Sequence, residues 1–270
     1  MTQQFDIIVI GDSKNGNSTI KQLALNNCKL KIAFISRNFK HSTTHDFLNV
    51  EYLKDEVIFT DYKNRLFGCY LKSGNRCYCT HIIFATGVKY APLILKNKPL
   101  PESFVNLNEI PKAAKMQSAV VFGNTDAAVK LALKVAKKYK LVYLCSKTIE
   151  LELKASATLQ KKLEAATNIA VLPNTSLLKV TTFTDGTLKT IELDNYSTIT
   201  CSAIFAVTDA IPETQEISIK LIQKNELGYL ITTSSCESNL VPKCYAIGNC
   251  AVKSTKKMEA AMLKSILADF

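Results

Sequence analysis

The stretch AVVFGNTDAAVKLALKVAKKYKLVYLCSKT, residues 119–148, decides the fold. It begins with a short apolar run that ends at Gly123, continues after Asp126 with apolar residues at helical spacing, and closes with a second apolar run, Leu141 to Cys145. This order predicts a strand, a tight turn, a helix and a second strand. The segment is long enough for the right-handed crossover that joins two parallel strands. The turn after the first strand would direct backbone N–H groups and a helix N-terminus towards an anion such as phosphate.

The start of the chain repeats this plan. Residues 5–10 form an apolar run, the polar turn GDSKNG lies between Gly11 and Gly16, a helical apolar pattern follows, and residues 30–35 are apolar again. One G-x-x-x-x-G is a weak signal, whereas two copies in matching context favour two nucleotide-type phosphate turns.

Composition limits the class of protein. The 270 residues, of which 47% are hydrophobic, fit one large or two medium domains with a sizeable core. No apolar run approaches the length of a membrane span, and MTQQFD does not resemble a signal peptide. Nine cysteines without a regular spacing suit a reducing compartment. We therefore expect a soluble, cytoplasmic protein with no membrane partner.

The net charge of +11 comes largely from lysines spread along the chain. Solvated helix faces explain such lysines better than a nucleic-acid interface, and no aromatic RNA-binding pattern accompanies them. We predict no nucleic-acid partner, although small anionic ligands remain compatible with this charge.

The region after the first unit contains candidate strands and two histidines. His41 and His45 are four residues apart, but no carboxylate or thiol pattern surrounds them, so no metal site is predicted. Residues 50–62, 65–72 and 76–85 read as strands of a small antiparallel meander that leads into the buried segment HIIFATG.

Four segments together resemble a known family. HIIFATGVKYAPL, residues 81–93, is similar to the A-T-G segment by which the pyridine nucleotide-disulfide oxidoreductases leave their flavin domain. Residues 104–123 resemble the linker and first strand of the nicotinamide domain, residues 163–193 the meander of the thioredoxin reductase branch, and residues 227–262 the closing flavin segment.

The resemblance implies a fold and a domain order. The expected fold is α/β, with two Rossmann-like three-layer domains, the second inserted in the first. Residues 1–109 with 210–270 would form the FAD-binding-like domain, and residues 110–209 the NAD(P)-binding-like domain. The strand in CYAIGNC (residues 244–250) should then join the first sheet, because it has no partner strand near it in sequence.

The resemblance also implies an FAD site, with three departures from the family pattern. Ser13 stands where the family has the middle glycine of the phosphate turn, Ser36 and Arg37 stand where it has the acid that binds ribose, and Asn249 replaces its aspartate. We expect FAD to bind weakly. The positions carried over as FAD-binding are Gly11, Ser13, Gly16, Ser36, Arg37, Thr86, Gly87, Gly248, Asn249, Lys257 and Met258.

NADPH or NADH is expected at the second turn. Gly123 and Ala128 match the ends of the family's G-x-G-x-x-A pattern, Asp126 lies in the turn, and Thr125 replaces the central glycine. A Cβ at Thr125 would narrow the space for a diphosphate and could be strained if the backbone needs a positive φ. Lys147 is the one basic residue placed to meet a 2′-phosphate, so a weak preference between the two cofactors is expected.

The cysteines separate this chain from thioredoxin reductases. The family's redox C-x-x-C would lie within IPKAAKMQSAVVFG, residues 110–123, which contains no cysteine, and the sequence has no C-x-x-C elsewhere. Two functions follow: an FAD-dependent NAD(P)H oxidoreductase without a redox dithiol, acting on an unidentified small-molecule or protein acceptor, or a catalytically inactive relative that senses a nucleotide or binds a partner. No catalytic residue is assigned, the nine thiols are interpreted as buried and structural, and a homodimer remains open.

Overall fold

The structure, a computed structural model, divides the chain into two compact units. Unit 1 comprises Met1–Lys89 and Ala210–Phe270, and unit 2 comprises Tyr90–Asp209. The chain changes unit at Lys89/Tyr90 and at Asp209/Ala210, whereas the predicted domain boundaries are 109/110 and 209/210. Residues 109, 110 and 209 lie outside the described residues, so these boundaries stay predictions. The structure describes residues 2–39, 47–90, 94–95, 98–99, 117–146, 156–182, 189–195, 197–207 and 210–270.

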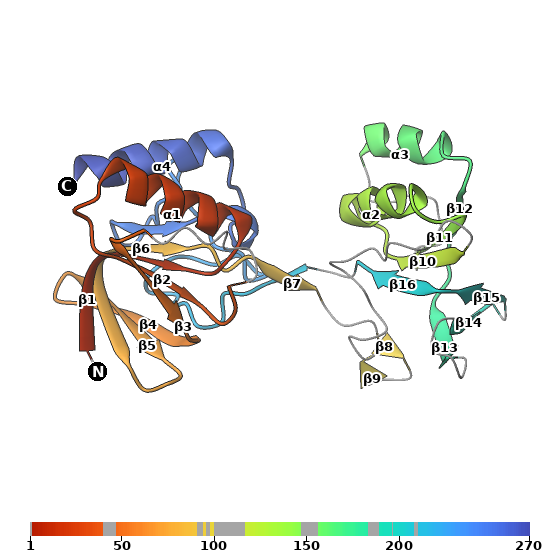
Figure 1. Ribbon diagram of the computed structural model, residues 1–270, viewed down its shortest axis with the longest axis horizontal. Helices are drawn as coiled ribbons and strands as arrows, with labels where there is room; N and C mark the ends of the chain where they lie inside the picture. The colour runs from red at the N-terminus through yellow and green to blue at the C-terminus, as the bar shows by residue number, and fades with distance from the viewer. Residues whose placement is uncertain are drawn as a thin grey trace. The chain divides into compact units, whose positions relative to one another are not determined.

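Unit 1 is built on a seven-stranded sheet with the order β3-β2-β1-β6-β5-β4, and β18 also pairs with β6 (Figure 1). Strands β1, β2, β3, β6 and β18 are parallel, whereas β4 and β5 continue the sheet antiparallel to β6. The bounds are β1 Thr2–Ile10, β2 Ile32–Ser36, β3 Val50–Lys54, β4 Val57–Lys63, β5 Leu66–Leu71, β6 Arg76–Phe84 and β18 Cys244–Ala246.

One strand prediction was wrong. Residues 50–62 form two strands, and the first of them, β3, pairs in parallel with β2 instead of joining the meander. The chain turns at Asp55, whose N–H bonds to the carbonyls of Ser36 and Leu53, while its carboxylate accepts the N–H of Glu56 at 2.7 Å. These local bonds end β3 at Lys54.

The prediction for the closing strand was correct. Cys244 pairs with Ile82 and Ala246 with Phe84, so β18 extends the parallel part of the first sheet. Its residues are fully buried, which explains their apolar character.

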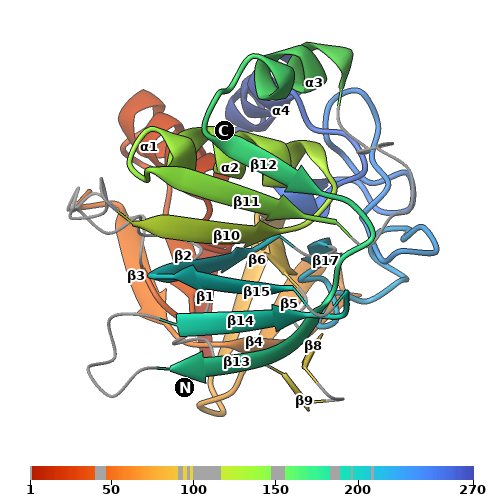
Figure 2. The ribbon, with the colours of Figure 1, turned by 90° about the vertical axis from the view of Figure 1, so that its right-hand side faces the viewer.

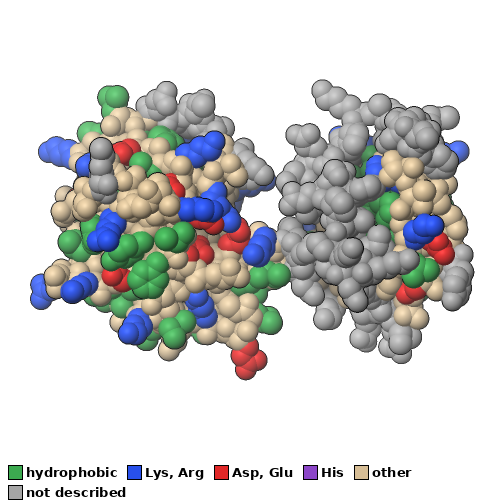
Figure 3. All heavy atoms as spheres, turned by 90° about the horizontal axis from the view of Figure 1, so that it is seen from below, with side chains coloured by type: hydrophobic (Ala, Val, Ile, Leu, Met, Phe, Trp, Pro, Cys, Tyr) green, Lys and Arg blue, Asp and Glu red, His purple; other side chains and the backbone are tan. Residues whose placement is uncertain are grey.

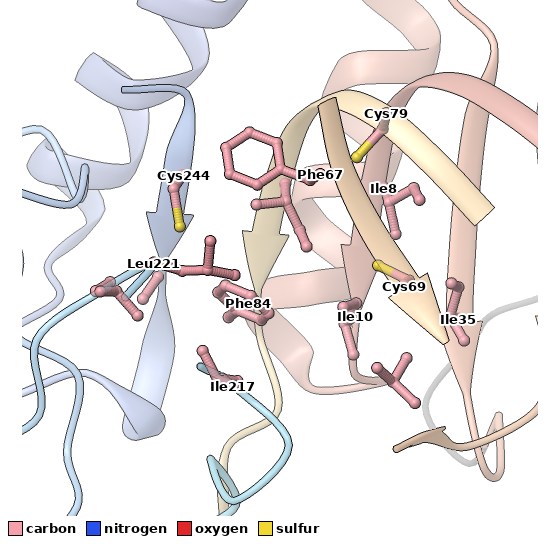
Figure 4. Close-up of a cluster of buried hydrophobic side chains, with 14 of the residues drawn as sticks. Ile8, Ile10, Ile35, Phe67, Cys69, Cys79, Phe84, Ile217, Leu221 and Cys244 are labelled. Carbon is pink, nitrogen blue, oxygen red and sulfur yellow. The ribbon is translucent and has the colours of Figure 1, made fainter. Parts of the chain in front are cut away.

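Two helices cover one face of this sheet. Helices α1 (Lys14–Asn26) and α4 (Lys256–Ala268) contact each other and bury Ile20, Leu23 and Met262 in one core cluster with β1 and β2 (Figure 1). The opposite face carries a second cluster, which includes the sheet residues Ile8 and Phe84; Ile217 and Leu221, from the irregular segment after β17, lie beside Phe84 (Figure 4). Unit 1 therefore has the three layers that were expected.

Unit 2 repeats the layered plan with a smaller parallel sheet, β12-β11-β10-β16 (Figure 2). Helices α2 (Asp126–Ala136) and α3 (Ala157–Glu164) pack on one face, and the antiparallel sheet β13-β14-β15 packs on the other. The strands are β10 Ser118–Phe122, β11 Leu141–Cys145, β12 Ile169–Leu172, β13 Leu177–Thr182, β14 Lys189–Leu193, β15 Thr198–Cys201 and β16 Ala203–Ala206.

The remaining elements are short. Strand β7 (Val88–Tyr90) pairs with β17 (Ala210–Pro212), β8 (Ile94–Leu95) pairs with β9 (Lys98–Pro99), and a 3₁₀ turn, η2, covers Gly248–Cys250. In the part of the chain that the structure describes, no helix is long and apolar enough to cross a membrane.

The sheet edge of unit 1 leaves some apolar side chains exposed. Ile58 and Phe59 of the terminal strand β4 are each at least half exposed. Figure 3 shows the face seen from below, where apolar side chains lie between lysines and arginines. No described strand pairs with the outer side of β4.

Candidate functional site

The predicted residues of unit 1 meet at one edge of the sheet. The register places Ile10 beside both Ile35 and Phe84, and Phe84 beside Ala246, so β1, β2, β6 and β18 end together. Strand β1 lies between β2 and β6, so the strand order changes direction at β1. The carboxyl end of β1 is therefore a topological switch point of the sheet. In open parallel sheets, ligands bind outside the carboxyl ends of the strands at such a point.

The turn between β1 and α1 brings backbone segments unusually close together. Gly11 has φ +105°, and a Cβ on it would lie 2.5 Å from the carbonyl oxygen of Ala85. A Cβ on Gly16 would lie 2.4 Å from the carbonyl oxygen of Gly11. Both positions therefore require glycine, which keeps the N-terminus of α1 against the sheet edge as a phosphate turn needs.

Ser13 plays a different role from the glycine it replaces. It is the N-cap of α1, with φ −80° and ψ 165°, and its Oγ accepts the N–H of Gly16 at 3.1 Å. Its backbone is unstrained, so the side chain is compatible with the turn. However, the Ser13 hydroxyl already accepts the N–H of Gly16, which could otherwise donate a hydrogen bond to a diphosphate.

The end of β2 carries the replacement for the ribose-binding acid. The Ser36 hydroxyl hydrogen-bonds the backbone of Asn38, donating to its carbonyl at 3.1 Å. Arg37 forms an ion pair with Glu213 and lies 3.7 Å from Glu56. The hydrogen bond with Glu213 raises the pKa of Arg37, with Glu56 adding to the effect. Within unit 1, the Arg37 guanidinium is thus engaged by the chain's own carboxylates.

The end of β6 carries a buried hydroxyl, Thr86 Oγ1, which interacts with the thiol of Cys250 and opposes the rise that burial causes in the pKa of that thiol. Thr86 Oγ1 has no oxygen or nitrogen partner among the described residues. Gly87, which follows it, has φ +73° and open space where a Cβ would lie. Buried hydroxyls normally have a partner, so Thr86 favours a ligand at this edge.

The closing segment lies beside the first turn. Gly248 has φ +72°, and a Cβ on it would lie 3.3 Å from the side chain of Asn15, the second residue of α1. Asn249 and Lys257 are exposed, and Met258 packs against the helix-side core. The structure therefore brings these predicted residues to the same edge as Gly11 and Thr86.

Three residues of this site, Asn15, Ser254 and Glu259, were missed by sequence reasoning. Asn15 Nδ2 donates to Glu259 Oε1 at 2.5 Å, and Ser254 Oγ donates to the same oxygen at 2.6 Å. Ser254 Oγ in turn accepts the N–H of Gly248 at 2.9 Å. The signal that could have found Glu259 is an acid in the first turn of the closing helix, directly beside the predicted Lys257 and Met258.

The second turn has the same construction in unit 2. Gly123 has φ +145°, and a Cβ on it would lie 2.4 Å from the carbonyl oxygen of Val207 and 2.8 Å from the Cβ of Ala128. Strand β10 ends beside Cys145 of β11 and Ala206 of β16, so this turn also leaves the sheet at a reversal of chain direction.

Thr125 does not carry the strain that a positive φ would have caused. It is the N-cap of α2 with φ −97°, and its side chain makes no capping hydrogen bond. Asp126 begins the helix as predicted, and its carboxylate accepts the N–H of Ser156 at 2.6 Å and lies 3.8 Å from Lys130. The predicted phosphate contact, Lys147, lies outside the described residues.

Sequence comparison gives the family. Residues 4–264 match the family described as Pyridine nucleotide-disulphide oxidoreductase. The chain belongs to this family. Its members are flavin-dependent oxidoreductases that generally bind FAD and NAD(P)H. No curated protein sequence matches the chain significantly.

Solved structures of the family share the fold of this chain. Thioredoxin reductase from Lactococcus lactis is 16% identical with a TM-score of 0.73, and the match covers 98% of this chain and 100% of that one. Thioredoxin reductase from T. acidophilum is 15% identical with a TM-score of 0.69, covering 98% of each chain. Bacillithiol disulfide reductase from Staphylococcus aureus is 16% identical with a TM-score of 0.63, covering 99% of each. These matches confirm the predicted α/β fold class and the resemblance to the thioredoxin reductase branch.

The residues present fit the family's dinucleotides at the turns. Each turn has a glycine, Gly11 or Gly123, at which a Cβ would clash with neighbouring backbone. At the first turn, the buried hydroxyl of Thr86, which has no oxygen or nitrogen partner among the described residues, lies at the same edge of the sheet. If FAD binds, the turn from Gly11 to Gly16 would hold its diphosphate, with Gly248 and Asn249 beside its ribityl chain. Nicotinamide cofactors would lie over Gly123 to Ala128.

All nine cysteines lie in the described residues as free thiols, and eight of them are buried. Burial raises the pKa of Cys77 and Cys236 to about 11 and that of Cys145 and Cys201 to about 12. At neutral pH only about one such thiol in 10⁴ or fewer is the reactive thiolate. The interpretation as structural thiols agrees with this burial; Figure 4 shows Cys69, Cys79 and Cys244 inside the core.

A metal centre finds no support in the described part of the chain. No group of three His, Cys, Asp or Glu residues there could hold a metal ion. His41 and His45 lie outside the described residues.

Proposed function

We propose that this protein is an FAD-dependent NAD(P)H oxidoreductase that passes hydride through the flavin to an acceptor outside the chain, without a redox dithiol of its own. The observation that carries the proposal is the pair of glycine-dependent turns, Gly11 to Gly16 and Gly123 to Ala128, each at the carboxyl edge of a parallel sheet. A bound flavin and nicotinamide would supply the hydride chemistry, and the chain would bind and orient them.

The acceptor would be reduced directly by the flavin. Thiol exchange needs an attacking thiolate and a resolving thiol that can bridge, and the sequence has no C-x-x-C. The burial of eight thiols supports the same conclusion, because a buried thiol with a raised pKa is a poor nucleophile. A small molecule or a protein without dithiol chemistry suits this role.

The second candidate function is a nucleotide-sensing or partner-binding relative without turnover. The observation that favours it is the engagement of the first site by the chain's own groups: Ser13 on Gly16, Glu259 on Asn15, and Glu213 on Arg37. Each of these contacts would have to yield or be accommodated when a dinucleotide binds.

The absorption spectrum of the purified protein, with an FAD titration, tests the proposal. Bound flavin together with NAD(P)H-dependent reduction of ferricyanide or a quinone would support the oxidoreductase. Protein that stays free of flavin at saturating FAD would refute it and leave the second candidate. A parallel assay with thioredoxin should give no turnover, and turnover that disappears when cysteines are replaced would overturn the acceptor assignment.

A further inference from the structure

A single carboxylate links the two halves of the first dinucleotide site. Glu259, in the first turn of α4, accepts hydrogen bonds on Oε1 from Asn15 in the first turn of α1 and from Ser254. Ser254 also receives the N–H of Gly248. The phosphate turn and the closing turn are therefore joined through Glu259, and α1 and α4 lie side by side over the sheet (Figure 1).

This carboxylate opposes a polyanionic ligand through its charge, although the glycine turn itself has the shape that a diphosphate needs. Helix N-termini attract negative charge, and Glu259 brings one to the place where α1 and α4 both begin. It also engages the Asn15 amide, a donor within the turn from Gly11 to Gly16. A diphosphate at that turn would meet a like charge at short range and would find this donor occupied.

We propose that Glu259 is the residue that sets how tightly the first site binds dinucleotides, by acting as an internal anion that disfavours a diphosphate at the β1–α1 turn. This inference rests on the proposed function, because it assumes that the turn is a diphosphate site. The alternative role for Glu259 is purely structural: its carboxylate would stabilise the start of α4.

A charge series of ligands distinguishes these two roles. FAD and ADP both carry a diphosphate, whereas riboflavin has the flavin ring without phosphate. In Glu259→Gln the side chain can still accept the hydrogen bonds from Asn15 and Ser254, so the fold is kept while the charge is removed. The affinities for FAD, ADP and riboflavin are measured by calorimetry or by quenching of flavin fluorescence.

The expected result is that Glu259→Gln binds FAD and ADP about tenfold more tightly than the wild type, with riboflavin changed by less than about twofold. The gap for FAD should narrow as salt is added, because salt screens the repulsion. Asp269→Asn is the matched control, since it removes the same charge from the opposite end of α4 and should leave all three affinities unchanged.

Each other outcome is decisive. Equal FAD and ADP affinities in the wild type and in Glu259→Gln would overturn the inference and leave the proposed function intact. A gain of the same size for riboflavin would also overturn it, because it would show a change of packing instead of charge. Absence of FAD and ADP binding in both proteins would overturn the inference and the proposed function together. Glu259→Ala, measured in the same way, guards against an effect peculiar to glutamine.

Discussion

The close packing of Gly11 against Ala85 predicts that Gly11→Ala destabilises the protein, and this can be measured without any cofactor. Replacing Gly11 by alanine puts a Cβ 2.5 Å from the carbonyl oxygen and 2.7 Å from the carbonyl carbon of Ala85. Ordinary contacts begin near 3.4 Å, so the backbone of β1 or β6 must shift by almost 1 Å. The partner atoms belong to the backbone of Ala85, which directly follows the central strand β6 as Gly11 follows β1, and backbone anchored in this way resists such a shift.

The magnitude has two parts. Overpacking of this kind costs about 1–3 kcal/mol, and a non-glycine residue at positive φ costs about a further 1–2 kcal/mol. Gly74, in the turn between β5 and β6, has φ +87° but no atom within 4 Å of its Cβ position. Gly74→Ala is therefore the matched control in the same unit, because it carries the φ cost without the overpacking.

Urea unfolding of the two variants measures the difference. With a slope of about 2 kcal/mol per molar, we expect the midpoint of Gly11→Ala to lie about 0.5–1.5 M below that of Gly74→Ala. Flavin binding should also be lost in Gly11→Ala, because the turn would open. Equal midpoints in the two variants would refute the close approach of Gly11 to Ala85 on which the site is built.

Three further predictions concern single side chains. Ser13→Gly should release the N–H of Gly16 and tighten FAD binding by about tenfold, at a cost in folding stability of only a few tenths of a kcal/mol. Ser13→Ala should lower the folding stability by about 1 kcal/mol. A titration in which neither variant gains affinity for FAD would contradict this prediction. Burial lowers the pKa of His81 and the carboxylate of Asp269 opposes that shift, so Asp269→Asn should lower the pKa of His81 further, as followed by NMR. The stability that depends on the neutral imidazole is complete above pH 6.5, the pKa of the unfolded state, and declines below it, more so in the variant. A His81 pKa that rises in the variant would contradict this prediction. A thiol reagent should label the native protein rapidly at Cys28 alone and all nine cysteines only after denaturation; rapid labelling of a second thiol would mean that the core opens.

Periodicity and glycine placement predicted most of the fold. The two strand-turn-helix-strand units were found because apolar runs, a glycine and a helical pattern follow one another at both places. The strand at residues 244–246 was predicted because a buried run needs a sheet, and β6 supplies it. The break at Asp55 was missed, since no proline or glycine marks it; the chain turns there through hydrogen bonds of Asp55 and Ser36 that no apolar pattern reveals.

The site was only partly predictable from the sequence. Motif positions identified the backbone turns, because their shape depends on glycines that can be read directly. The conformations at Ser13 and Thr125 could not be read, and the structure shows both as unstrained N-caps. The partners of Arg37 and Asn15 lie 176 and 244 residues away along the chain, and only the fold brings these charged and polar groups together.

The two candidate functions share one fold and differ in the free energy with which the first site binds a dinucleotide. A dinucleotide that displaces Ser13 from Gly16 and Glu259 from Asn15 gives up one neutral hydrogen bond and one to a charged group, together about 2–4 kcal/mol before any new contact forms. The exposed pair of Arg37 with Glu213 adds at most about 1 kcal/mol. At 1.4 kcal/mol for each factor of ten, these contacts weaken binding by about two to three orders of magnitude relative to an open turn. An enzyme with this site would hold FAD only where the flavin concentration exceeds that weaker dissociation constant, and below it the same chain would be a flavin-free, two-unit protein. Occupancy measured against FAD concentration, in the wild type and in Glu259→Gln, therefore decides which of the two functions operates.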